Sequence, residues 1–272
     1  MIELGIATHH TRVERWECDY NNHWNTRFYA RSFQLAIETV TTPAGMVSSG
    51  SAVVRSCHMR FHRELLVSAP VEVRSAVLKG GHLSGAIVHL LTSAGEVAAT
   101  ALHFTEEAGR LPHVTPEDVP LAMPRGINPE AVADWPEGGG QEVSISLGPI
   151  RPADMDHTDE LMFEHILRHS SITSHLQLSH MGFTPEFSKR TGINRMAVEF
   201  HVRRGRTPPV GTPLYGQSKL LRVNGKTFWT VHRILTATND TVAKIDQCLV
   251  AVDLKTRRAV EAPEFLQAAL VH

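Results

Sequence analysis

Hydrophobic residues recur at spacings of three and four in the stretch that precedes Pro43. This periodicity places them on one face of a helix that packs against a core. Asn25 is suited to cap the first turn, and Pro43 prevents the helix from continuing. We therefore predict a helix over 25–41. The residues that carry the spacing are Tyr29, Phe33, Ala36 and Val40.

The remaining pattern is mainly that of strands, apart from a second helical segment over 161–181. Each helix is preceded by a short predicted strand and followed by longer ones. Asn224-Gly225 is a hairpin signal between two of these strands, and Gly80-Gly81 occupies the matching place in the first half. Tandem strands exclude a parallel doubly wound sheet and predict a sheet wrapped around its helix. The predicted strands are 12–16, 143–150, 195–204, 213–223, 226–238 and 241–254.

The two halves of the chain repeat this plan at a nearly constant offset. Asp19 matches Asp156 at an offset of 137, and identical residues farther along match at 143. Offsets that change only in loops indicate a duplicated unit. The pairs at an offset of 143 are His58 with His201, Arg60 with Arg203, Pro70 with Pro213, Leu78 with Leu221 and His89 with His232.

A segment of distinct composition separates the halves. Residues 107–141 hold six prolines and five glycines among 35 residues. Such a segment is typical of a long surface connection with little regular structure. We predict an N-terminal domain over 1–106, a linker over 107–141 and a C-terminal domain over 142–272.

Composition narrows the functional classes. The 272 residues include 42% hydrophobic and 20% charged residues, which excludes a disordered or fibrous chain. The net charge of −1 argues against nucleic acid or an anionic membrane as the main partner. The longest apolar run, 248–252, is far shorter than the ~18 residues of a membrane span, and no signal-peptide pattern opens the chain. Three scattered cysteines suit neither a disulfide scaffold nor a Cys-based zinc site. We expect a cytoplasmic protein.

The loop before the first helix carries the candidate chemistry. Asp19, Asn21, His23 and Asn25 stand at alternate positions, so in an extended loop their side chains project to one side. The helix start adds unpaired N–H groups and a positive dipole end, which suit an oxyanion. Asp19 or His23 would act as a nucleophile or as the base for a water molecule. In the alternative interpretation, the loop only caps the helix.

The run Asp-x-Asn-x-His-x-Asn from Asp19 to Asn25, followed by Tyr29, resembles the catalytic loop of plant-type acyl-ACP thioesterases. It is also similar to the Asp-x-x-Gly-His-x-Asn-x-x-x-Tyr signature of 4-hydroxybenzoyl-CoA-type thioesterases, with Asn22 in place of Gly. Asn tolerates the left-handed backbone that such a Gly adopts. Both groups belong to the hotdog-fold superfamily. The resemblance implies an α+β double hotdog, with two antiparallel sheets each wrapped around a long helix.

The same resemblance implies the activity and its residues. The expected reaction is hydrolysis of an acyl-CoA or acyl-carrier-protein thioester, with no cofactor and no metal. Asp19, Asn21 and His23 match the catalytic residues of the motif. We assign substrate binding to Asn25 and Tyr29 in the first half.

The second loop departs from the motif. Asp156 is kept, but Thr158, Glu160 and Met162 replace the first Asn, the His and the last Asn. We therefore expect one complete site per chain, on the first loop, with Asp156 and Glu160 contributing to substrate binding.

Two other functions fit the same fold. One is hydration or dehydration of a 3-hydroxyacyl or enoyl thioester, in which Asp156 or Glu160, or Asp19 with His23, would transfer protons. The other is a non-catalytic module that binds acyl-CoA, since the second loop shows that a site can be lost.

The spacing of two histidine pairs is compatible with metal binding, but neither pair has the other features of a metal site. His58 and His62 are four residues apart in a predicted strand, where this spacing does not form a helix face. His165 and His169 lie on a predicted helix but lack an accompanying Glu motif. We expect His58, like His201, to mark a packing position of the repeat.

Assembly is the last prediction from the sequence. Hotdog units commonly pair back to back, so we expect a homodimer of chains. Phe228-Trp229 places large apolar groups on both faces of one strand, whereas a strand with one solvated face alternates more cleanly.

Overall fold

The computed structural model describes residues 4–19, 21–41, 54–105, 111–131, 135–136 and 142–270. The chain forms two compact units, each built from two segments. The first unit comprises Met1–Arg125 and Ala153–Leu167. The second comprises Gly126–Pro152 and Arg168–His272. The loop that precedes the second helix therefore packs with the first unit.

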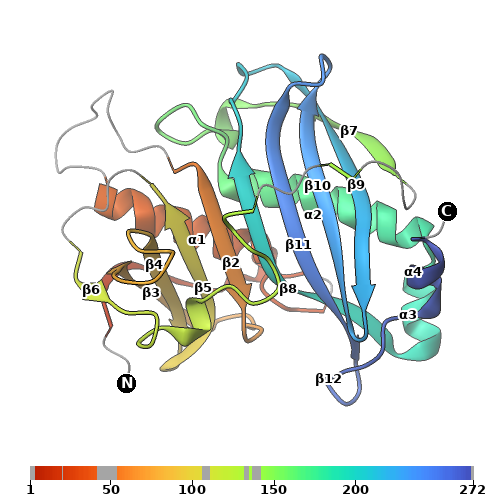
Figure 1. Cartoon of the computed structure of the whole chain (residues 1–272), viewed down its shortest axis with the longest axis horizontal. Coiled ribbons are helices and arrows are strands. Elements are labelled where there is room, and N and C mark those ends of the chain that lie inside the picture. Colours follow the sequence, from red (N-terminus) through yellow and green to blue (C-terminus); the bar gives the residue numbers. More distant parts are fainter. Residues whose placement is uncertain are drawn as a thin grey trace. The chain divides into compact units, whose positions relative to one another are not determined.

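The first unit is an antiparallel sheet that carries one helix (Figure 1). Helix α1 (Thr26–Thr41) packs on strands β1, β3, β4 and β5. The short strand β6 (His113–Val114) pairs in parallel with β3 at the margin of the sheet. In spatial order, the antiparallel strands are β1 (Ile6–Arg12), β3 (Pro70–Leu78), β4 (Ile87–Ser93), β5 (Glu96–Phe104) and β2 (Ser56–Phe61).

Helix α1 forms where its sequence predicts. The Asn25 side-chain oxygen accepts the Arg27 backbone N–H at 3.2 Å, so Asn25 is the predicted cap. Phe33 lies on the buried face and is fully enclosed, whereas Leu35 on the opposite face is 40% exposed. This one-sided burial confirms the helix predicted over 25–41.

The second unit repeats the arrangement with longer strands. Helix α2 (Phe163–His180) begins in the first unit, and its later turns pack in the second, where Leu178 shares a core with Phe183 and Phe228. Two short helices, α3 (Pro185–Thr191) and α4 (Glu264–Ala268), were not predicted. The strands in spatial order are β8 (Ile193–Arg204), β11 (Thr241–Asp253), β10 (Thr227–Thr236), β9 (Pro213–Asn224) and β7 (Val143–Pro149), with β12 (Arg258–Ala259) paired to β11.

The strand register confirms the repeat. Ser75 lies opposite His89 in the first sheet, and Ser218 lies opposite His232 in the second, both at the offset of 143. The Ser75 hydroxyl is 2.7 Å from His89 Nδ1, and both side chains are buried. His58 and His201 are buried as well, as expected for a shared packing position. The two halves thus share one strand plan.

One predicted strand is wrong. Residues 12–16 do not form a strand, because β1 ends at Arg12 and Arg15–Glu17 forms the 3₁₀ helix η1. The reason is the burial of Glu17, whose carboxylate accepts the Glu14 backbone N–H at 3.3 Å and the Trp24 indole N–H at 2.8 Å. These contacts close the backbone into a turn.

The segment predicted as a featureless connection is partly packed. Within 111–123, the 3₁₀ helix η2 (Pro120–Ala122) and Val119 join a hydrophobic cluster with Leu90 and Leu102. Leu90 follows His89, which contacts the Phe33 ring of α1. Successive residues of a strand point to opposite faces, so this cluster covers the face of the sheet that α1 does not.

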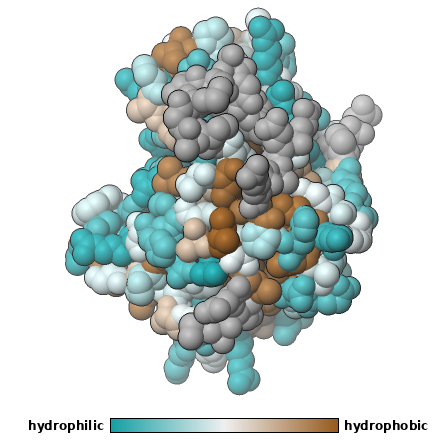
Figure 2. All heavy atoms as spheres, turned by 90° about the vertical axis from the view of Figure 1, so that its left-hand side faces the viewer, coloured by the Kyte–Doolittle hydropathy of each residue, from teal (hydrophilic) through white to brown (hydrophobic). Residues whose placement is uncertain are grey.

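Trp229 is likewise covered by a segment of the same chain, the one that contains Gly126. Its indole N–H donates to the Gly126 carbonyl at 3.1 Å, and the Arg222 guanidinium lies 3.8 Å from its ring centroid. The apolar group that suggested a back-to-back dimer is therefore used within the second unit. On the face shown in Figure 2, hydrophobic residues form separate patches among hydrophilic ones. The homodimer stays a prediction.

Replacing Phe33 by Ala should lower the free energy of unfolding by about 3–5 kcal/mol, because it leaves a cavity beneath α1. Urea unfolding followed by circular dichroism measures the change. The matched control is Leu35→Ala on the exposed face of the same helix, expected within about 0.5 kcal/mol of the wild type. Equal losses in the two variants would contradict the packing described.

Two buried histidines should make stability depend on pH. Burial lowers the pKa of His89 to about 3 and that of His232 to about 4, from the ordinary 6.5. Between these values and 6.5 the unfolded chain binds protons that the folded chain does not, so stability rises with pH by up to about 1.4 kcal/mol per pH unit per histidine. Above 6.5 this dependence ends.

Urea titrations from pH 4 to pH 8 test this dependence. The variants His89→Gln and His232→Gln should each reduce the slope below pH 6.5, whereas His82→Gln, at an exposed position, should leave it unchanged. A free energy of unfolding that is flat below pH 6.5 would refute the expectation.

Candidate active site

The loop before α1 is a tight turn organised by Asp19. One carboxylate oxygen, Oδ1, accepts the backbone N–H groups of Asn21 at 2.8 Å and His23 at 3.1 Å. The Asp19 N–H donates to the His23 carbonyl at 2.8 Å. Asn22 has a φ of +63°, as anticipated for a residue that replaces Gly. The premise of an extended loop is therefore wrong, and Asp19, Asn21 and His23 belong to one closed turn.

The structure adds a carboxylate that the sequence analysis missed. Glu64 Oε1 lies 3.1 Å from His23 Nδ1, and about one fifth of each side chain is exposed. The Trp24 N–H donates to the Leu65 carbonyl at 2.8 Å, which holds the two segments together. No local pattern connects residues 41 positions apart. The only available signal was the polar run His62-Arg63-Glu64 between apolar neighbours.

Tyr29 fixes the segment that carries Glu64. Its hydroxyl accepts the Leu65 N–H at 3.2 Å and lies 3.4 Å from the Arg63 carbonyl, to which it donates. These are the two residues that flank Glu64. The ring is buried, and burial raises the pKa of the phenol. Tyr29 therefore holds the segment that carries Glu64, and its role in substrate binding stays a prediction.

An ion pair between a buried carboxylate and a partly exposed guanidinium ties the turn to α1. Glu17, enclosed beneath the loop, bonds the Trp24 indole and pairs with the Arg31 guanidinium one helical turn into α1. A buried carboxylate is stable only with such partners. Trp24 also contacts the Tyr29 ring, with centroids 4.4 Å apart. The turn is thus held from below by packed side chains.

The helix start offers a single open donor. Asn25 Oδ1 caps Arg27, the Asn25 carbonyl accepts the Phe28 N–H at 2.9 Å, and the Asn25 N–H donates to the Glu17 carbonyl at 3.0 Å. Within the part of the chain that the structure describes, the Thr26 N–H meets no acceptor and Asp19 Oδ2 receives no donor. We expected several unpaired N–H groups at this helix start, but among the described residues only the Thr26 N–H is unpaired.

The second loop has the same backbone. Asp156 Oδ1 accepts the N–H groups of Thr158 at 2.9 Å and Glu160 at 3.1 Å, and Asp159 has a φ of +59°. The Thr158 hydroxyl adds a third bond to this oxygen, at 2.6 Å. Glu160 is half-buried. The repeat therefore extends to the turns that precede both helices.

The two loops differ in the hydrogen-bond partners of the first helix N–H and of the second aspartate oxygen. The Gln34 side chain of α1 accepts the Phe163 N–H at 2.9 Å and donates to Asp156 Oδ2 at 3.2 Å. Phe163 and Thr26 are the first residues of their helices. Gln34 and the second loop all belong to the first unit. The groups that remain open at the first loop are occupied at the second.

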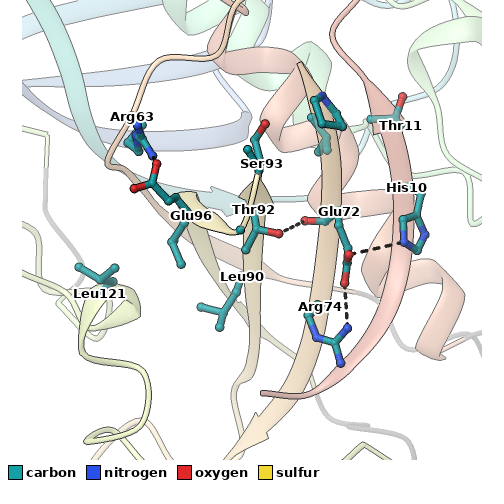
Figure 3. Close-up of a pocket in the computed structure, with 15 residues that line it drawn as sticks. His10, Thr11, Arg63, Glu72, Arg74, Leu90, Thr92, Ser93, Glu96 and Leu121 are labelled. Atoms are coloured by element: carbon teal, nitrogen blue, oxygen red, sulfur yellow. Dashed lines mark hydrogen bonds and ion pairs between the residues drawn. The ribbon is translucent and has the colours of Figure 1, made fainter. Parts of the chain in front are cut away.

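A surface pocket lies elsewhere in the first unit (Figure 3). It opens over β1, β3, β4 and β5 near Leu90 and Leu121, on the face away from α1. Its charges are largely paired, since Glu72 meets Arg74 at 2.8 Å and His10 at 3.8 Å. None of its lining residues comes from either aspartate turn, so it is not part of the candidate site.

Among the described residues, no group of three or more His, Cys, Asp or Glu side chains is arranged to hold a metal ion. No helix in the described segments has the length and apolar character required to cross a membrane.

Comparisons with known proteins identify the family and the fold. The sequence profile described as "Thioesterase-like superfamily" matches residues 13–114 and 150–270. No curated protein matches the sequence significantly. Among similar solved structures, a Lactobacillus plantarum protein assigned as an oleoyl thioesterase has 14% identity and a TM-score of 0.63, covering 91% of this chain and 97% of its own.

Two further structures show the same likeness. An acyl-ACP thioesterase from Bacteroides thetaiotaomicron has 11% identity and a TM-score of 0.56, covering 89% of this chain and 96% of its own. A 12:0-ACP thioesterase from Umbellularia californica has 12% identity and a TM-score of 0.53, with coverages of 89% and 93%. Identities this low establish the fold alone. The predicted α+β double hotdog is confirmed.

Tyr29→Phe should lower the free energy of unfolding by about 1–3 kcal/mol, because the buried Leu65 N–H loses its acceptor. Hydrogen exchange at the Leu65 amide should accelerate, which reports on the segment that carries Glu64. Tyr215→Phe, at an exposed position, is the matched control and should change neither quantity. Unchanged exchange at Leu65 in Tyr29→Phe would show that the hydroxyl does not hold this segment.

Proposed function

The chain belongs to the thioesterase-like superfamily, and on this basis we propose that it hydrolyses an acyl thioester, carried by CoA or by an acyl-carrier protein, to a free acid and a thiol. The observation that carries the proposal is the Gln34 carboxamide at the second loop. There, the oxygen of a planar carboxamide accepts the first N–H of a helix, and its nitrogen donates to Oδ2 of the turn aspartate. Among the described residues, the corresponding two groups of the first loop are open.

A thioester placed likewise at the first loop has its carbonyl oxygen on the Thr26 N–H. The positive end of the α1 dipole supports negative charge that develops on this oxygen in the transition state. Asp19 Oδ2 then faces the carbonyl carbon, because Oδ1 is held by the turn. In this arrangement Asp19 orients the attacking water, or it attacks the carbon itself, in which case the C–S bond breaks, the thiol leaves and water then hydrolyses the mixed anhydride to the free acid and Asp19.

His23 and Glu64 supply the proton transfer. Glu64 lies at His23 Nδ1 and orients the ring, and we assign Nε2 as the nitrogen that takes the proton. In the direct route, water adds to the carbonyl carbon as Nε2 takes its proton, and the proton then passes to sulfur as the C–S bond breaks. The Asn21 backbone N–H is part of the turn, and its side chain is the third candidate catalytic group, beside those of Asp19 and His23.

The alternative functions depend on other groups. A hydratase that uses Asp156 would need a free carboxylate, but both oxygens of Asp156 accept hydrogen bonds. That alternative therefore depends on Glu160, or on Asp19 with His23. Incubation with acyl-CoA and enoyl-CoA substrates separates the classes. Thiol release supports the thioesterase, loss of the conjugated double bond without thiol release supports the hydratase, and thermal stabilisation without either supports the binding module.

Asp19→Asn should lower kcat/KM for thiol release by about 100-fold or more. The amide oxygen of Asn can still accept the Asn21 and His23 N–H groups, so the turn persists while the reactive carboxylate is lost. His23→Gln should cause a loss of the same order. Thiol release is measured with a chromogenic thiol reagent.

The matched control is Asp118→Asn, which alters a carboxylate that caps a surface turn at Thr115. It should retain full activity. Wild-type rates in Asp19→Asn and His23→Gln, with both proteins folded by circular dichroism, would remove the site assignment.

A further inference from the structure

Gln34 is a buried polar residue on the face of α1 that meets the second loop. Only 4% of its surface is exposed, and both ends of its carboxamide are used. Its oxygen accepts the Phe163 N–H at 2.9 Å, and its nitrogen lies 3.2 Å from Asp156 Oδ2 and 2.9 Å from Glu38 Oε1. The amide is therefore held in one orientation by three partners, all in the first unit.

The two groups that Gln34 meets at the second loop are the counterparts of those assigned to the substrate at the first. Phe163 N–H corresponds to Thr26 N–H, and Asp156 Oδ2 corresponds to Asp19 Oδ2. A carboxamide and a thioester are both planar acyl groups with one carbonyl oxygen. Gln34 thus places an acyl group of the protein itself where a substrate acyl group would bind.

We propose that Gln34 is an internal occupant that closes the second loop, and that its amide limits each chain to one thioester-binding site. This inference rests on the proposed function, because it takes the first loop as the substrate site. Without the Asn and His of the motif, the second loop lacks the side chains proposed to catalyse hydrolysis. Gln34 in addition occupies the groups to which a substrate acyl group would bind. The closure is thus a property of α1 and not of the loop alone.

Displacement of Gln34 by a ligand is unfavourable. A ligand that entered would leave a buried carboxamide without its partners. The competing amide is tethered to the same unit, so its effective concentration far exceeds that of a dissolved substrate. At the matching position of the second helix, offset by 137, the sequence has Ser171, which is exposed. The occupant is therefore present in only one half of the repeat.

The test is binding stoichiometry with a probe that cannot be hydrolysed. S-(2-oxoalkyl)-CoA keeps a carbonyl but has a methylene group between it and sulfur, so no thioester is cleaved. A series of chain lengths is titrated into the wild type by calorimetry, and the tightest member is used throughout. We expect one probe per chain in the wild type. We expect two per chain in Gln34→Ser, which introduces the residue of the matching position, and in Gln34→Ala.

A second readout locates the added site. With ¹⁵N-labelled phenylalanine, the Phe163 amide resonance should move on probe addition in the Gln34 variants and stay fixed in the wild type. Thr39→Ala, an exposed position on the same helix, is the matched control and should bind one probe. One probe per chain and a fixed Phe163 resonance in both folded Gln34 variants would overturn the inference, as would two probes in the wild type.

Failure of the proposed function has a different signature. If the wild type binds no probe and releases no thiol from any acyl-CoA, the assignment of the first loop is wrong. One probe in the wild type and one in the Gln34 variants, with thiol release intact, removes only the role of Gln34.

Discussion

Burial of one face of α1 is the constraint on which the first unit depends. Phe33, Ala36 and Ile37 are taken out of water by the sheet, and burying a large apolar side chain such as Phe or Ile contributes about 1.5–3 kcal/mol. Since consecutive helical residues differ in direction by about 100°, this choice of face also sets the direction of every other side chain. It brings Arg31 to the buried Glu17 below the turn and directs Gln34 toward the second loop.

The duplicated turns show that equal backbones do not imply equal chemistry. In each, one aspartate oxygen accepts two backbone N–H groups, and the residue three positions later is left-handed. The difference lies in the second oxygen, which is open at Asp19 and bonded to Gln34 at Asp156. A single side chain on another element therefore distinguishes the two loops.

The interiors of the two units have diverged in the same manner. Beneath α1 the helix presents Phe33 and Ile37, whereas α2 presents Ser174, at the position that matches Ile37. In the second unit Gln247 Oε1 accepts from Ser174, Thr230 and His232. The second unit therefore retains the strand plan and adds a buried polar network to its hydrophobic core.

The sequence by itself determined the two helices, most strands, the duplicated plan and the position of the aspartate loops, because periodicity, turn preference and motif spacing are local properties. It did not determine that these loops are closed turns. It failed at residues 12–16, where burial of Glu17 outweighs strand propensity. Glu64 and Gln34 could not be found in this way. Backbone contacts between the turn and the segment after β2 bring Glu64 to His23, and helix packing brings Gln34 to Asp156, 122 positions away. Only the tertiary structure decided which helix start stays open, because the acceptor of the Phe163 N–H is a side chain of another helix.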